Sequence, residues 1–402
     1  MRWTVVAVWV LVIYTTIPFV RVIREWFVAH WDPRLISWLV AGALIVASVA
    51  TAVLLARRKR ELQKGAFAWT LVVTAVLVLW TFSLRRSPEE AVHFLEYGAL
   101  AVLVYRALRP SLPDASVFVA GFLLGAIAGT FDEVIQWLSP ARFWDWRDLA
   151  LNAGAGALVQ FALWRILPPG PGRFQPRSMR VVLRLAAVQL LLLLLCLANT
   201  PERVARYAPL LPFADHLMSS HNPMAEYGHL HTAQGIGSFK SRLSVEELLV
   251  QDRTRAEEVA AALDASRRSY GSFLDTWPVA TDPFTYEARV HLFSRDRNLG
   301  RARQLDNEGA RARAYLSVAW FENLLLERFF GTALEHSSYR WAPPKRRHVE
   351  SLHDPELSFR SAAGSHLITF ASESRLRAAM FVLLALILVA DLVLGRYDGL
   401  RR

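Results

Sequence analysis

Cysteine is almost absent from this sequence, and the only one, Cys196, lies in a run of apolar residues. A single cysteine excludes any internal disulfide bond. The large polar segment at residues 200–374 must therefore fold through packing alone. The sequence also contains neither an internal repeat nor a low-complexity tract.

Lysine is scarce as well, but arginine is abundant, and the formal net charge is +11. A charge of this size raises the question of a nucleic-acid partner. Residues 200–374, however, hold 21 Lys and Arg against 22 Asp and Glu, and the rest of the chain holds 25 against 13. The excess lies in and beside long apolar runs, where membrane topology accounts for it, so we expect no nucleic-acid partner.

Apolar residues make up 53% of the chain. Several runs of about 18 or more are long enough to cross a hydrocarbon core of about 30 Å as helices. We therefore expect an all-α polytopic membrane bundle that carries a mixed α+β extracytoplasmic domain. The eight expected spans are residues 3–20, 35–56, 66–84, 90–108, 116–138, 148–167, 181–198 and 376–394. The first span has no small-x-small cleavage site, so we expect it to stay uncleaved.

Basic residues beside these spans predict the orientation. The run RRKRELQK at 57–64 should be cytoplasmic, because loops on that side are enriched in lysine and arginine. With eight spans, both termini then also lie inside. The further arginines on the cytoplasmic side are Arg106, Arg109, Arg173, Arg177, Arg180, Arg396, Arg401 and Arg402. Arg21, Arg24 and Arg34 fall outside and fit this orientation least well.

A break in the helical pattern divides the chain. The stretch PPGPGRFQP at 168–176 cannot continue a helix and separates the first six spans from the C-terminal part of the chain. The expected organisation is a six-span membrane domain at 1–167, a cytoplasmic linker at 168–180, a seventh span at 181–199, the extracytoplasmic domain at 200–374, and an eighth span with a cytoplasmic tail at 375–402.

Four elements are predicted inside residues 200–374. A helix at 244–264 begins with a capping box, in which Ser244 precedes Glu247 by three residues. TYEARVHLF at 285–293 alternates like a half-buried strand. A helix at 312–331 ends at its glycine, and SHLITFAS at 365–372 is expected to form a second strand.

Three polar clusters stand at the ends of long apolar runs: HFLEYG at 93–98, DEVIQ at 132–136 and ARFWDWRDLALN at 141–152. Ionisable groups at a membrane boundary are costly unless they are paired or have a function. The predicted topology puts all three clusters at the outer interface. Small residues, namely Gly121, Gly125 and Gly129 in the fifth span and 153–156 in the sixth, allow the helices to approach closely. We therefore expect one shared site.

The residue types in these clusters suit chemistry at a phosphate. A histidine beside a carboxylate serves as a general base or a nucleophile, and an arginine binds phosphate through its planar fork. Adjacent acids share a proton or hold a divalent cation, and we assign no metal ligand among them. The candidate catalytic residues are His93, Glu96, Asp132, Glu133, Gln136, Asp148 and Asn152. The candidate substrate-binding residues are Arg142 and Tyr97.

A purely structural interpretation of the same residues stays open. Asp132 and Glu133 lie near a helix C-terminus, where negative charge is unfavourable, so they need partners. Their partners in that case are Arg85, Arg86, Arg142 or Arg147. Asp148 and Asn152 could in that case simply cap the sixth span.

Histidines cluster in the polar segment, where the pair at 229 and 231 has other ligand types nearby. The neighbouring residues are Asp215, His216, His221 and Glu226. Their spacing is irregular, so a polar loop is favoured over a metal site. Trp277, Trp320 and Trp341 are expected in the core, and the basic run at 345–347 is expected to be a solvated loop.

With these motifs in place, residues 65–167 resemble the VanZ-like family of bacterial membrane proteins. The matching features are HFLEYG, DEVIQ, Arg142 six residues later, and Asp148 with Asn152 before a run of small residues. Ile135 departs from the pattern, because many relatives have a second histidine there. The family takes its name from a protein that gives low-level resistance to teicoplanin. The resemblance implies a lipid-processing enzyme related to phospholipid headgroup-exchange synthases.

Two functions are retained as hypotheses. The first is an enzyme at the outer face of a bacterial inner membrane that acts on a phosphate-linked headgroup of a phospholipid or polyprenyl carrier, in envelope or exopolysaccharide metabolism or glycopeptide resistance. The alternative is a non-enzymatic protein that binds a membrane lipid or glycopeptide and docks an envelope partner through residues 200–374. A transporter would need polar groups at the bilayer midplane, where the sequence places few.

Overall fold

The computed structural model describes residues 1–57, 65–84, 87–140, 142–167, 174–212, 215–218, 223–265, 269–305 and 309–400. The chain forms two compact units, which we name the membrane unit (Met1–Cys196 with Ala378–Arg402) and the polar unit (Leu197–Arg377). Several features of the sequence lie outside the described residues: most of the basic run at 57–64, Arg85, Arg86, residues 168–173, His221, Arg401 and Arg402.

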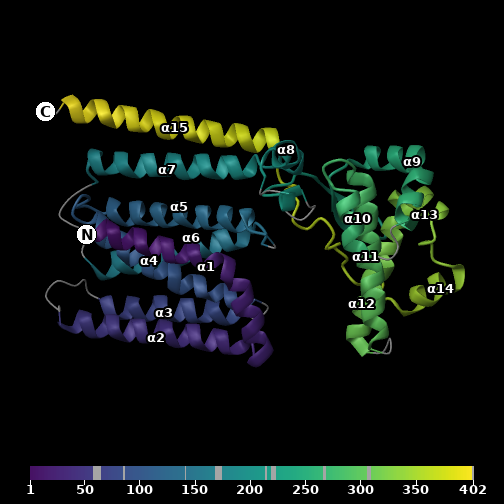
Figure 1. The fold of residues 1–402 in the computed structure, drawn as a ribbon, viewed down its shortest axis with the longest axis horizontal. Helices are drawn as coiled ribbons and strands as arrows, with labels where there is room; N and C mark the ends of the chain where they lie inside the picture. The colour runs from purple at the N-terminus through teal and green to yellow at the C-terminus, as the bar shows by residue number, and fades with distance from the viewer. Residues whose placement is uncertain are drawn as a thin grey trace. The chain divides into compact units, whose positions relative to one another are not determined.

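The membrane unit is a bundle of long helices, as predicted. Among the described residues, eight helices are long and apolar enough to cross a membrane, and they coincide with the eight expected spans. The chain is therefore a polytopic membrane protein by length and composition. The helices run roughly parallel to one another in Figure 1. They are α1 (Arg2–His30), α2 (Arg34–Arg57), α3 (Ala66–Ser83), α4 (Val92–Leu108), α5 (Ser116–Leu138), α6 (Trp146–Ile166), α7 (Pro176–Leu197) and α15 (Glu373–Leu400).

The centre of the membrane unit is formed by α4, α5 and α6, which pack against one another. Glycines permit this close approach. A Cβ on Gly121 would overlap the side-chain amide of Gln160, and one on Gly129 would lie 3.0 Å from Cβ of Asn152. Gly125, in contrast, faces open space. Two of the three glycines expected to bring α5 against its neighbours therefore do so.

The first helix crosses this central group and changes direction. Pro18 lies inside α1, where proline removes a backbone hydrogen bond, and Figure 1 shows the bend. Before the bend, Trp9 Nε1 donates to the carbonyl of Glu96 at 3.0 Å. Tyr14 donates to the carbonyl of Ala128 at 2.9 Å. These bonds tie α1 to α4 and α5.

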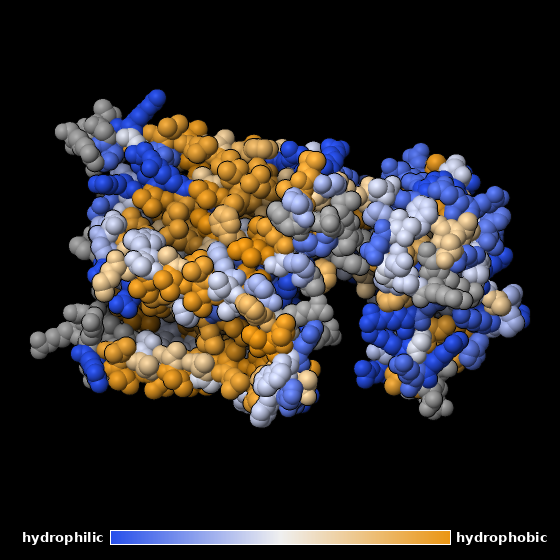
Figure 2. Space-filling model, in the orientation of Figure 1, coloured by the Kyte–Doolittle hydropathy of each residue, from blue (hydrophilic) through white to orange (hydrophobic). Residues whose placement is uncertain are grey.

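The outer surface of the membrane unit is apolar. Leu11, Val46, Leu79 and Leu392 are each at least 60% exposed, as suits side chains that face lipid. Apolar residues cover much of the visible face of this bundle in Figure 2. Charge inside the bundle is neutralised locally, since Nε of Arg180 on α7 lies 2.9 Å from Oδ1 of Asp391 on α15.

The described part of the polar unit is mostly helical and contains one small sheet. Strands β1 (His229–Ala233) and β2 (Gly237–Ser241) form an antiparallel hairpin in which His229 pairs with Ser241. Gly235 and Gly237 have positive φ angles in the turn. The helices are α8 (Pro201–Tyr207), α9 (Val245–Ala265), α10 (Tyr270–Thr276), α11 (Pro283–Arg303), α12 (Gly309–Phe329), α13 (Gly331–His336) and α14 (Pro343–Leu352).

Two helices of the polar unit were predicted correctly. In α9, Glu247 Oε2 accepts from the backbone N–H of Ser244 at 2.7 Å, and Ser244 Oγ accepts from the N–H of Glu247 at 3.2 Å. This is the expected capping box. The predicted helix at 312–331 is α12, which ends at Phe329.

Both predicted strands are wrong. Residues 285–293 lie in α11, which begins with Asp282 as N-cap and Pro283 in its first turn. This helix packs against α9 and α12, and its polar residues Glu287 and His291 are buried. The polar residues in the pattern therefore do not lie on a solvent-exposed face, as the strand prediction assumed. Residues 365–372 form only a single bridge, between Ile368 and Tyr227. The true hairpin, β1 with β2, was not predicted.

Candidate functional site

Asp132 joins three helices of the membrane unit. Its carboxylate accepts a hydrogen bond from the hydroxyl of Tyr97 on α4 at 2.9 Å, and a longer one from Nδ2 of Asn152 on α6 at 3.4 Å. All three residues are only 1% exposed. The structure thus brings one member of each polar cluster together. Tyr97, a candidate for substrate binding, is placed so that its hydroxyl positions Asp132.

His93 and Glu96 form a second group on α4, one turn from the first. Nδ1 of His93 lies 3.1 Å from Oε2 of Glu96. Their side chains are 16% and 22% exposed, so both are partly accessible. The imidazole also lies close enough to Asp132 and Asp148 to interact with their charges. Nε2 of His93 has no partner among the described residues.

This arrangement fixes the chemistry of the imidazole. When Nδ1 donates its proton to a carboxylate, Nε2 carries the free lone pair and accepts a proton. The same carboxylate stabilises the imidazolium that results. In that tautomer Nε2 is the ring nitrogen that can accept a proton, which is the arrangement that general-base chemistry requires.

Glu133 belongs to a separate network at the end of α5. Its Oε1 accepts from Nε2 of Gln136 at 3.1 Å, and its Oε2 accepts from the backbone N–H of Asp145 at 3.3 Å. Arg142 donates to Oε1 of Gln136. Neighbouring residues on a helix point in different directions, so Asp132 and Glu133 do not share a partner. The expected pairing of these two acids is not found.

The purely structural interpretation is weakened by the arginines. Arg147 lies 2.9 Å from Glu90 rather than against Asp132 or Glu133. Arg142 contacts the amide of Gln136. Within the described ranges, no basic residue forms an ion pair with either acid. Arg142 is near enough to Asp132 for their charges to interact, and Arg85 and Arg86, the other two arginines of that interpretation, lie outside the described residues.

Neither Asp148 nor Asn152 is the N-cap of α6, although the charge of Asp148 in the first turn does favour the helix dipole. The N-cap of α6 is Asp145, whose side chain accepts from the backbone N–H of Arg147 at 2.7 Å. Asp148 lies in the first turn, and Asn152 binds Asp132 instead. Oδ1 of Asp148, Oδ1 of Asn152 and Nε of Arg142 are all buried without a hydrogen-bond partner in the described part of the chain. Such atoms are rare unless a ligand or water completes them.

An apolar cavity of about 480 Å³ adjoins the His93–Glu96 pair. It lies among α2, α3, α4 and α6, and Glu96 forms part of its wall. Its hydroxyl groups, such as those of Thr70 and Thr74, donate to carbonyls of their own helix and leave the wall effectively apolar. Representative lining residues are Leu44, Val73, Leu77, Phe94, Val159 and Leu163.

No metal site forms from the described residues, in which no group of three or more His, Cys, Asp or Glu is arranged around a common point. In the polar unit, His231 Nε2 lies 2.9 Å from the carbonyl of Leu243. Glu226 forms ion pairs with Arg242 and with His366, the latter at 3.4 Å. Burial would raise the pKa of Glu226, but the bond with His366 and the charge of Arg242 outweigh it and hold this pKa below its usual range.

Several residues that shape the site were not predicted. Trp9 and Tyr14 fix α4 and α5 from α1, and Glu90 engages Arg147. The acids at 89–90, just before HFLEYG, gave a signal that could have been used. The sequence gave no comparable signal for Trp9 and Tyr14, because their hydrogen bonds to backbone carbonyls depend on how the helices cross.

No protein-family model, no curated protein and no solved structure matches this chain.

Proposed function

We propose that this chain is an enzyme that transfers or hydrolyses a phosphate-linked headgroup on a phospholipid or polyprenyl carrier. The proposal places the site at the outer face of a bacterial inner membrane, with both termini in the cytoplasm, and relates residues 65–167 to the VanZ-like family. The observation that carries it is the His93–Glu96 pair, which stands beside the Asp132 group and opens next to an apolar cavity.

His93 is the general base in this proposal. Glu96 accepts a hydrogen bond from Nδ1–H, which keeps its proton, and Nε2 removes a proton from water or from a headgroup hydroxyl, so that the ring becomes an imidazolium. The activated oxygen attacks phosphorus, and the bond from phosphorus to the departing oxygen breaks. Asp132, held by Tyr97 and Asn152, stabilises the imidazolium. Direct attack by Nε2 on phosphorus is the nucleophilic variant of this scheme.

Arg142 is suited to the phosphate. Gln136 holds one edge of its guanidinium, and its buried Nε is unpartnered. A guanidinium fork matches two phosphate oxygens, so a phosphate placed here would complete the missing hydrogen bond. Glu133 and the backbone of Asp145 keep the loop that carries Arg142 against α5.

The apolar cavity is suited to the hydrocarbon part of the substrate. Its volume of about 480 Å³ falls in the range of about 300–1,000 Å³ usual for small-molecule sites. Glu96 lines it and also binds His93. A lipid chain in this cavity would therefore bring its headgroup to the imidazole.

Lipid profiles of a deletion strain test the proposal. The strain is complemented with the wild-type chain, with His93→Gln, or with His30→Gln as a matched control, since His30 is an exposed histidine at the end of α1. We expect the wild type and the control to restore the lipid profile and His93→Gln to leave it altered. Full restoration by His93→Gln at equal expression would contradict the catalytic role.

A further inference from the structure

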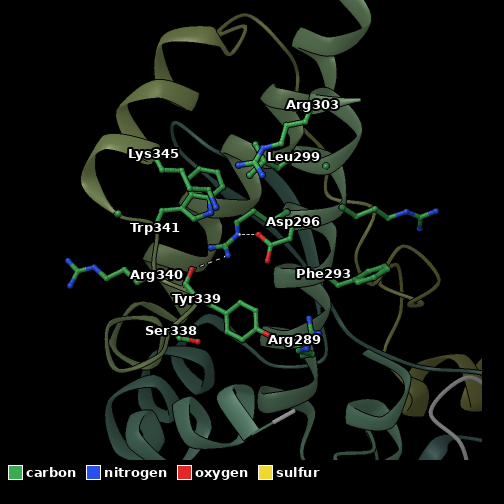
Figure 3. Close-up of a pocket in the computed structure, with 14 residues that line it drawn as sticks. Arg289, Phe293, Asp296, Leu299, Arg303, Ser338, Tyr339, Arg340, Trp341 and Lys345 are labelled. Carbon is green, nitrogen blue, oxygen red and sulfur yellow. Dashed lines mark hydrogen bonds and ion pairs between the residues drawn. The ribbon is translucent and has the colours of Figure 1, made fainter. Parts of the chain in front are cut away.

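The polar unit contains a strongly basic pocket of about 620 Å³, which lies between α11 and the segment that leads into α14 (Figure 3). The residues that line it include one acid, Asp296, and six basic residues, of which Arg340 points away from the pocket in Figure 3 and forms an ion pair with Glu335. The basic residues are Arg289, Arg295, Arg297, Arg303, Arg340 and Lys345. This imbalance stands out in a unit whose overall charge is near neutral.

The two deepest arginines differ in their partners. Arg295 is 1% exposed, and its guanidinium donates to Asp296 at 2.9 Å, to Asn323 at 3.1 Å and to the carbonyl of Tyr339 at 3.0 Å. Arg289 is 6% exposed and forms no hydrogen bond or ion pair with any described residue. Its Nε is buried and unpartnered.

An unpaired buried guanidinium is costly, because a charge removed from water needs an opposite charge or several acceptors. Aromatic rings offset part of this cost. The guanidinium of Arg289 lies 5.2 Å from the ring centre of Tyr270 and 5.5 Å from that of Tyr339. The rings leave Nε without a hydrogen-bond partner among the described residues, and the positive charge favours an anionic ligand at this position.

The aromatic rings in the pocket already form cation–π contacts with its basic side chains. Arg295 and Lys345 each lie 5.0 Å from the ring centre of Trp341. The ring of Phe293 stacks on Tyr270 at 3.9 Å. Because these rings are occupied, a ligand is recognised here through charge and hydrogen bonds more than through stacking. Nε1 of Trp341 is buried without a partner and adds a neutral donor.

The electrostatics of Lys345 agree with this picture. Burial lowers the pKa of its ammonium group, Asp296 opposes that effect, and the charges of Arg295 and Arg303 lower the pKa further. Lys345 therefore lies in a part of the pocket where the charges of neighbouring arginines reach it. Arg297, Arg303 and Arg340 are exposed, and Arg340 forms an ion pair with Glu335. Arg303 is left to attract an anion from solution.

We propose that this pocket binds a ligand that carries two or more phosphoryl groups, with Arg289 and Arg295 at its floor and Arg303 and Lys345 at its rim. Arginine forks match phosphoryl oxygens, and several arginines facing one acid require more negative charge than a single carboxylate supplies. The volume exceeds that of one phosphate. The ligand is either a free phosphorylated compound or the headgroup of an anionic lipid.

Binding by the full-length chain in phosphatidylcholine nanodiscs tests this site. One arm titrates inorganic pyrophosphate by calorimetry, and the other measures flotation with vesicles that contain cardiolipin, whose headgroup carries two phosphates, against vesicles of phosphatidylcholine alone. Each arm compares the wild type with Arg289→Gln, with the double variant Arg303→Gln and Lys345→Gln, and with Arg253→Gln. Arg253 is an exposed arginine on α9 that does not line the pocket.

We expect Arg289→Gln to weaken binding by about tenfold or more, the double variant Arg303→Gln and Lys345→Gln to weaken it several-fold, and Arg253→Gln to leave it unchanged. Pyrophosphate binding with this pattern identifies a free ligand, and vesicle binding with this pattern identifies a lipid headgroup. If Arg289→Gln fails to fold, the loss of binding in the double variant is the result that tests the proposal. Absence of binding in both arms, or an equal loss in Arg253→Gln, would overturn the proposal.

Discussion

Buried carboxylates have different partners in the two units. In the polar unit, four of the five described buried acids contact a basic side chain, and Asp252 is the exception. These four are Glu226, Asp282, Glu287 and Glu322. In the membrane unit, the described buried acids are bonded by neutral donors. These are Asp114, Asp132 and Glu133.

The difference lies in the kind of partner that each unit gives to a buried acid. An acid paired with arginine is neutralised and adds specificity to the fold. An acid held by a tyrosine hydroxyl or an amide has no basic partner of its own. In the proposed function, Asp132 interacts with the imidazolium of His93. The basic pocket of the polar unit is the reverse case, in which Arg289 is buried and lacks an acid.

The largest effect is expected from breaking the buried ion pairs. Arg242 contacts both Glu226 and Glu287, and its side chain is 11% exposed. Arg242→Met would leave two buried carboxylates without this partner and should lower the free energy of unfolding of the polar unit by about 3–5 kcal/mol. Hydrogen exchange of the amides in α9 and α11 measures this. Arg253→Met, at an exposed position, should change it by less than about 0.5 kcal/mol. Equal protection in both variants would show that the ion pairs contribute little.

A smaller effect is expected where the helices of the membrane unit approach closely. Gly129→Ala places a Cβ 3.0 Å from Asn152, and the resulting shift should cost about 1–3 kcal/mol. Gly125→Ala is the matched control, because nothing lies within 4 Å of its added Cβ. The thermal midpoint in detergent should fall for Gly129→Ala only. A fall of the same size in Gly125→Ala would contradict the packing described for α5 and α6.

A still smaller loss of stability is expected when Asp132 is replaced by the neutral residue asparagine. The hydroxyl of Tyr97 can still donate to the amide oxygen of Asp132→Asn, so the loss should be about 1 kcal/mol. Glu287→Gln, which removes a charge facing Arg242, should cost more. Thermal midpoints of the two variants in the same detergent compare them. A larger loss in Asp132→Asn would reverse the contrast between the units.

The smallest effect is a pH dependence of the polar unit. The folded-state pKa of Glu226 lies below its ordinary value of 4.5, so its contribution to stability is present above about pH 4.5 and is lost as the pH falls through the folded pKa. Unfolding of the wild type should therefore become easier on acidification below about pH 4.5. Glu226→Gln should flatten this part of the profile. If the stability of Glu226→Gln fell on acidification as much as that of the wild type, groups other than Glu226 would be responsible for the pH dependence.

Hydropathy predicted the membrane unit well, because a span must be long and apolar and because a polar residue is conspicuous there. The clusters containing Tyr97, Asp132 and Asn152 could be placed together once the topology was drawn. The contacts of Trp9 and Tyr14 could not, because they depend on how α1 crosses α4 and α5.

The polar unit was harder to predict for a physical reason. In α11, Glu287, Arg289 and His291 are buried and partnered by charges or rings, so the alternation of polar and apolar residues imitates a strand. Asp282 and Pro283 were the local signal of a helix start. Trp341 was expected in the core and is buried, but its contacts with Arg295 and Lys345 could not be inferred from chain positions so far apart.

Turnover of a labelled phospholipid by the purified chain in nanodiscs tests the central claim most directly. The headgroup is labelled, and its release or transfer is followed for the wild type, His93→Gln and His30→Gln. We predict turnover by the wild type and the control, and a loss of about 10²–10⁴-fold in His93→Gln, as expected when a general base is removed. Turnover by His93→Gln at the wild-type rate, or saturable binding with no turnover by any variant, would contradict a catalytic role for this histidine.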